Sequence, residues 1–142
     1  MSADELPEEE VLIRAITDRL YDERKGRYSS EVFGKPRTSV SRLAILGYDD
    51  IVRIFCSDLH RPPDSTLLGY VEISVGALKE YGRNFESNGK PDRRQIIVEA
   101  KPVFKEIGML DNPAHAEIKD GLPRSMNKEI LRALKMTSVE CK

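Results

Sequence analysis

The run from Leu67 to Val75 constrains the fold most, because apolar residues occupy every second position along it. The alternating set is Leu67, Gly69, Val71, Ile73 and Val75. A period of two is typical of a β-strand with one buried face. A shorter alternation over residues 96–100 predicts another strand, which should end near Pro102. The chain must therefore contain a sheet that buries one face against other elements.

The segment from Pro7 to Arg24 has apolar residues at the spacing of a helix. Leu12, Ile16 and Leu20 recur every four residues, which places them on one helical face. Proline is favoured in the first helical turn, and the acidic residues after Pro7 suit the positive end of the helix dipole. The pattern predicts an amphipathic N-terminal helix.

Further helices are expected later in the chain. One begins at Asp49 or Asp50, either of which can cap it, and ends before Pro62. A short helical run is expected over 77–81, and a C-terminal amphipathic helix over 126–136.

These elements predict one α+β domain over residues 1–142. A mixed or antiparallel sheet of three to four strands packs against the amphipathic N- and C-terminal helices. Residues 1–6 and 137–142 are expected to fray. No apolar run reaches the roughly 20 residues that span a bilayer, so we expect no membrane contact.

Charge and cysteine content bear on partners and location. The 23 basic and 24 acidic residues give a net charge of −1, but residues 24–61 hold eight bases and four acids. A protein dedicated to nucleic acid is usually more basic overall. Residues 24–61 are therefore the only part of the sequence that favours a nucleic-acid partner.

The two cysteines, Cys56 and Cys141, and the lack of a secretory signal indicate a cytoplasmic protein whose thiols stay reduced.

Residues 27–41 predict a long ordered loop, followed by a short strand at 42–46. Arg37, Ser39 and Arg42 lie in this region and form a candidate phosphate- or partner-binding set, because arginine forks and hydroxyls bind phosphate or carboxylate oxygens. The alternative is that the hydroxyls satisfy local turns while the arginines are solvated or pair with the acidic N-terminus.

His115 is the candidate catalytic residue. It follows the Asn112-Pro113 turn between two alanines, which leave room around the imidazole. A group that titrates near neutral pH can act as general acid or base. The alternative is that a ring nitrogen fixes the loop by bonding a backbone carbonyl.

A metal site is not predicted. Cys56 and His60 share a helical face and would supply half of a zinc site, but only His115 and Cys141 are left to complete it. Cys56 is expected to be a small core residue, and His60 to lie at the C-terminus of its helix.

Two functional hypotheses follow, from different classes. Nucleotide-binding loops, hydrolase elbows and paired metal-ligand motifs are missing from the sequence, so no cofactor is expected and the first hypothesis is a non-catalytic adaptor that binds another protein. The alternative is a small enzyme or toxin-like domain acting on RNA or a nucleotide, with His115 as general acid/base and Arg37 or Arg42 stabilising charge. A nucleic-acid-binding module without chemistry is a third possibility.

Overall fold

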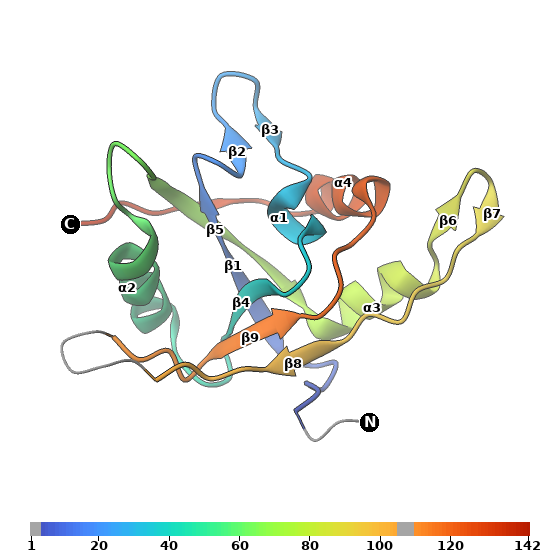
Figure 1. The fold of residues 1–142 in the computed structure, drawn as a ribbon, viewed down its shortest axis with the longest axis horizontal. Coiled ribbons are helices and arrows are strands. Elements are labelled where there is room, and N and C mark those ends of the chain that lie inside the picture. The colour runs from blue at the N-terminus through green and yellow to red at the C-terminus, as the bar shows by residue number, and fades with distance from the viewer. Residues whose placement is uncertain (1–3, 105–109) are drawn as a thin grey trace.

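The computed structural model describes residues 4–104 and 110–142, and it is built on one antiparallel sheet (Figure 1). Within these residues the sheet has six strands, in the order β10-β5-β1-β4-β9-β8. Their bounds are β1 Val11–Thr17, β4 Thr38–Arg42, β5 Leu67–Ser74, β8 Val98–Ala100, β9 His115–Ile118 and β10 Thr137–Ser138. The single α+β domain is confirmed, and the expected three to four strands are too few. Of the strands that were not expected, β9 and β10 are too short to show alternation, and β1 was interpreted as a helix.

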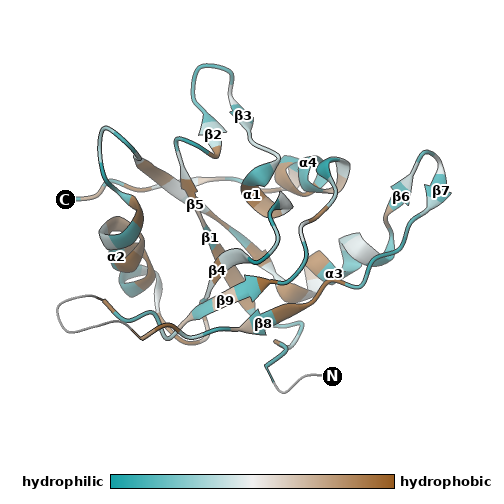
Figure 2. Cartoon of the chain, in the orientation of Figure 1, coloured by the Kyte–Doolittle hydropathy of each residue, from teal (hydrophilic) through white to brown (hydrophobic). Residues whose placement is uncertain are grey.

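Four helices accompany the sheet in the described residues. They are α1 Glu31–Gly34, α2 Tyr48–Leu59, α3 Val75–Arg83 and α4 Arg124–Ala133. Two hairpins project from the body, and Figure 2 shows both as mainly hydrophilic: β2 Tyr21–Asp22 with β3 Arg27–Tyr28, and β6 Glu86–Ser87 with β7 Lys90–Pro91. None of the described helices has the length and hydropathy needed to cross a membrane.

The expected N-terminal helix is wrong, because residues 11–17 form β1, an inner strand of the sheet. Leu12 and Ile16 enter the larger core, whereas Ile13 and Ala15 enter the smaller core on the other face. A spacing of four residues returns to the same face of a strand as well as of a helix. A strand buried on both faces also reads as a nearly continuous apolar run, so the spacing alone did not distinguish the two structures.

The later expectations agree better with the structure. The strand at 67–75 is confirmed by β5, and the expected helices correspond to α2, α3 and α4 within a few residues. Gly47 is the N-cap residue of α2, and Asp49 and Asp50 lie in its first turn instead. The loop expected over 27–41 contains β3, α1 and nearly all of β4.

Helices cover the two faces of the sheet unequally. Helices α1, α3 and α4 contribute to the larger core, together with side chains from β1, β4, β5, β8 and β9. On the other face, Ile51 and Phe55 of α2 pack with Ile13 and Ala15 of β1. The smaller core takes no described residue from β4, β8 or β9. That half of the face is therefore available for polar side chains.

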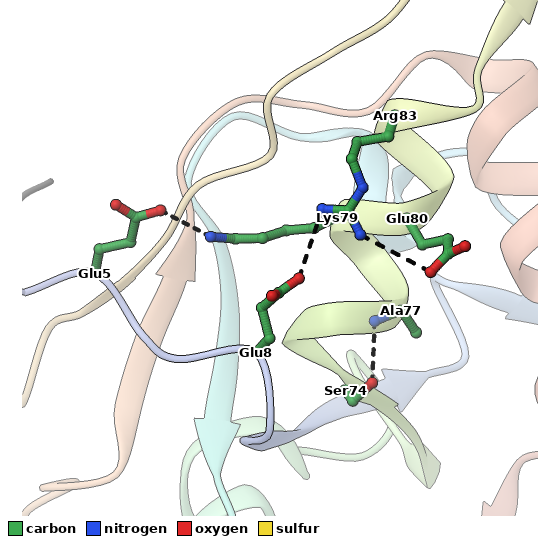
Figure 3. A network of polar contacts seen from close by, with 7 residues as sticks. All are labelled: Glu5, Glu8, Ser74, Ala77, Lys79, Glu80 and Arg83. Atoms are coloured by element: carbon green, nitrogen blue, oxygen red, sulfur yellow. Dashed lines mark hydrogen bonds and ion pairs between the residues drawn. The ribbon is translucent and has the colours of Figure 1, made fainter.

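Helix α3 anchors the N-terminal segment through ion pairs (Figure 3). The Ser74 hydroxyl caps the helix by accepting from the Ala77 amide at 3.0 Å. The Lys79 ammonium lies 2.9 Å from the largely buried Glu5 carboxylate, and Arg83 pairs with Glu8 at 3.5 Å. These contacts hold residues 5–8 against α3.

Both chain ends, expected to fray, are paired in the described residues. The Leu6 amide donates to the Val98 carbonyl at 2.9 Å, and β10 pairs with Gly69 and Tyr70 of β5. The path of β10 brings Cys141 to α2, where it forms a disulfide with Cys56. Their Cα atoms lie 5.6 Å apart, and the two cysteines are separated by 85 positions. The sequence-based expectation that both thiols stay reduced does not agree with this disulfide.

We expect Cys141→Ser to lower the free energy of unfolding by about 2–4 kcal/mol, because the crosslink restricts a long loop of the unfolded chain. Urea denaturation followed by circular dichroism measures this change. Dithiothreitol should destabilise the wild-type protein by a similar amount and leave the variant unaffected. Equal stability of the oxidised wild type and the variant would contradict the structural role of the bond.

Candidate functional site

Polar side chains gather on the part of the sheet that α2 leaves uncovered. Ser39 and Ser41 alternate with the buried Val40 on β4, and His115 and Glu117 alternate with the buried Ala116 and Ile118 on β9. The register places Ser41 opposite His115, and Ser39 opposite Glu117. Because side chains alternate along a strand, these four residues share one face of the sheet.

His115 joins the Ser39 hydroxyl to a backbone carbonyl. Its Nδ1 lies 2.7 Å from the Lys101 carbonyl oxygen, and its Nε2 lies 3.1 Å from Ser39 Oγ. A carbonyl oxygen only accepts hydrogen bonds, so Nδ1 carries the proton and donates it. In the neutral ring Nε2 is then the acceptor and faces the serine hydroxyl. This gives a hydroxyl, a base and a group that orients the base, which is the arrangement that activates a nucleophile.

Arg14 lies with Leu12 and Ile16 on the larger-core side of β1, and it meets the site at the edge of the pocket, where its guanidinium bonds the Ser39 carbonyl. Its Nε donates to the Val32 carbonyl at 2.8 Å, and its Nη1 donates to the Ser39 carbonyl at 3.3 Å. Loss of water around the group lowers the pKa of Arg14 to about 10. No salt bridge holds Arg14 within residues 4–104 and 110–142. A guanidinium has more N–H donors than these two carbonyls use, so Arg14 can still bind an anion.

A pocket of about 360 Å³ lies between these residues and α2. Arg14, Ser39 and His115 line it with Asp58, Asn112 and the apolar residues Ile54, Phe55, Leu59 and Val103. Asn112 is only 8% exposed, and its Oδ1 has no hydrogen-bond partner among residues 4–104 and 110–142. A buried acceptor without a partner costs free energy. A ligand N–H or O–H in the pocket would satisfy it.

The structure brings two of the four candidate residues from the sequence together. His115 begins β9 instead of lying in a loop, and Ser39 contacts it. Arg37 lies at the edge of the same face and pairs with Glu117 at 3.4 Å. Arg42 is held elsewhere, because its Nε and Nη2 donate to both carboxylate oxygens of Glu10 at 2.8 and 2.7 Å. These hydrogen bonds raise the pKa of Arg42.

Sequence reasoning missed Arg14 and Asn112. The signal for Arg14 was a single cation within the apolar run of residues 11–17, which is unusual for a strand buried on both faces. It went unused because the run was interpreted as a helix, whose polar face accommodates a cation. Asn112 was interpreted as a turn residue before Pro113, and only the structure shows that its amide is buried.

The residues considered for zinc have other roles here. Cys56 is bonded to Cys141, and Nδ1 of His60 accepts from the Leu67 amide at 3.2 Å. Among the described residues, no group of three or more histidine, cysteine, aspartate or glutamate side chains is arranged to hold a metal ion.

Comparison of the chain with protein-family models, with curated proteins and with solved structures found no match. The chemistry of the pocket is therefore the basis for a functional proposal.

We expect Arg42→Ala to lower the free energy of unfolding by about 3 kcal/mol, because Glu10 would be left as a buried charge without its partner. Thermal and urea unfolding measure the loss. The double variant Glu10→Gln/Arg42→Ala should recover part of it, since no buried carboxylate then lacks a cation. Wild-type stability of Arg42→Ala would show that the pair contributes little.

Proposed function

We propose that the chain is a small enzyme that transfers or hydrolyses a phosphate group of a nucleotide-type substrate in this pocket. The observation that carries the proposal is the hydrogen-bonded series from Ser39 to His115 to the Lys101 carbonyl. Beside it lies the guanidinium of Arg14, which has no salt bridge in the described residues. This supports the enzyme alternative over the adaptor, because general-base activation of a hydroxyl needs this geometry.

The proposed reaction begins at Ser39. Its oxygen attacks the phosphorus atom while its proton moves to Nε2 of His115, and the bond from phosphorus to the leaving oxygen breaks with its electron pair. The protonated His115 then gives the proton to that leaving oxygen. Water then attacks the phosphorus of the phosphoserine while His115 Nε2 takes its proton, and the bond from phosphorus to Ser39 Oγ breaks with its electron pair. His115 returns the proton to Ser39 Oγ as phosphate leaves. Arg14 binds the phosphate oxygens throughout and stabilises the charge that develops on them.

The remaining walls fit a nucleoside. Ile54, Phe55 and Leu59 supply an apolar surface from α2, on which a flat base can lie. Asn112 Oδ1 offers an acceptor to an N–H of the base. The pocket volume of about 360 Å³ is at the lower end of the range for small-molecule sites, which favours a mononucleotide.

The adaptor remains the second candidate function, but the exposed hydrophobic side chains give it less support. Ile45, Tyr48 and Phe104 are the large hydrophobic side chains exposed in the described residues, whereas protein-binding sites usually present a contiguous apolar patch.

We retain a cytoplasmic location for the protein as part of the proposal. A disulfide that persists in the cell would instead favour an oxidising compartment.

Ser39→Ala and His115→Ala should each reduce phosphate release from nucleoside monophosphates by about 10²–10⁴-fold, because each removes one member of the pair. A colorimetric phosphate assay measures the rate, and Ser138→Ala, in the exposed strand β10, is the matched control. Rates that stay within a factor of two in both pocket variants would rule out this mechanism. An unfolded His115→Ala would instead show that the imidazole fixes the strand, and His115→Gln would then replace it in the assay.

Nucleoside monophosphates should raise the melting temperature of the wild-type protein, since a ligand bound only to the folded state stabilises it by about 2.7 kcal/mol at 100 times its Kd. Arg14→Gln should abolish this shift, because the phosphate loses its cation. Differential scanning fluorimetry over a range of nucleotide concentrations measures both. A shift of equal size in Arg14→Gln would show that the nucleotide binds elsewhere.

A further inference from the structure

A second hollow lies between α4 and the β2–β3 hairpin, and its lining is strongly basic. This groove has a volume of about 580 Å³. Its cations are Arg27, Arg124, Lys128 and Arg132, and none of the described residues that line it is acidic. It shares no lining residue with the pocket at His115. The inference drawn from it is therefore independent of the proposed function.

Three of the cations form a row along α4. Arg124, Lys128 and Arg132 are spaced four residues apart, so they lie on one face of the helix about 6 Å apart along its axis. The opposite face holds the helix in the larger core through the buried residues Met126 and Ile130. The row is therefore fixed in place and faces away from the core.

The wall of the groove opposite α4 is tied to the helix. Asn127 accepts at Oδ1 from the Phe33 amide at 2.8 Å, and its Nδ2 donates to the Ser29 carbonyl at 3.4 Å. Tyr28, which lines the groove, packs on Tyr21 of the paired strand with ring centroids 4.8 Å apart. The hairpin, α1 and α4 thus form one preorganised surface, and preorganisation lowers the entropy lost on binding.

The groove cations differ from the basic residues of α3 in their partners. On α3, Lys79 pairs with Glu5, and Arg83 pairs with Glu8 and Glu80, as Figure 3 shows. In the part of the chain that the structure describes, no salt bridge involves any of the four groove cations. Within the described residues these four charges are therefore left to solvent or to a ligand.

We infer that this groove binds a single strand of RNA through its phosphates. A row of cations matches the regular row of negative charges on a phosphodiester backbone, and arginine guanidinium groups bind phosphate through bidentate hydrogen bonds. Tyr28 adds an aromatic surface on which a base can stack. The overall charge of −1 means that the attraction is local to the groove.

Fluorescence anisotropy with a labelled oligouridine about twelve nucleotides long, within the range of known single-strand site sizes, tests the inference. The double variant Lys128→Gln/Arg132→Gln should bind about tenfold more weakly than wild type. The plot of log affinity against log salt should become shallower by about 1.4, since the variant loses two phosphate contacts and each contributes about 0.7 to the slope. Glutamine keeps most of the side-chain stem, and both positions are exposed, so the melting temperature should stay unchanged.

The matched control is Arg83→Gln, which removes one exposed arginine that already has carboxylate partners. It should leave RNA affinity within a factor of two of wild type. Weakening by the control of about threefold or more, which is the share of one charge in a tenfold effect of two, would overturn the inference, because binding would then follow total charge. Displacement of the RNA by poly-glutamate at equal charge concentration would also overturn it, since the groove would then accept an acidic polypeptide. Weak competition by poly-glutamate supports the inference.

Discussion

The burial of β1 on both faces, with one cation inside it, is the constraint on which the rest of this structure depends. Ile13 and Ala15 serve the smaller core, while Leu12 and Ile16 serve the larger. Arg14 sits between them and bonds the carbonyls of Val32 and Ser39. Withdrawing a guanidinium from water is unfavourable, as its lowered pKa shows. Such a cost is common at functional sites, where perturbed groups are arranged for binding or chemistry.

The sheet topology turns this strand into one wall of a site. Because β4 lies between β1 and β9, the Ser39 carbonyl meets Arg14 while the Ser39 hydroxyl meets His115. Helix α2 covers only the β1 and β5 side of that face, so its apolar residues form the opposite wall of the pocket. Because α2 covers only half of this face of the sheet, Ser39 and His115 on the uncovered half lie beside the apolar residues of α2.

Charge pairing separates structural from available cations. Arg42, Lys79 and Arg83 are held by carboxylates of the N-terminal segment, at Glu10, Glu5 and Glu8. The acidic N-terminus, which was expected to stabilise a helix dipole, instead neutralises basic residues across the fold. The cations of α4 and β3 have no such partners in the described residues. The protein therefore has a basic groove although its overall charge is nearly neutral.

Much of the candidate site was out of reach of sequence reasoning. His115 and Ser39 were both candidates, but nothing in the sequence indicated that they touch, because their contact depends on the register of β4 against β9. Arg42 was a candidate for the same chemical reason as Ser39, and alternation along β4 places it on the opposite face. Asn112 became a functional candidate only because its oxygen is buried without a hydrogen-bond partner in the described part of the chain.

The sequence by itself determined the elements whose period is unambiguous. Strand β5 and helices α2 and α4 each show one buried face, and a single buried face leaves a regular pattern in the chain. Tertiary structure decided the nature of β1, the disulfide and the site, since each depends on neighbours distant in sequence. A strand covered on both faces loses its alternation, and cross-strand contacts leave no local pattern, so only the assembled sheet could reveal them.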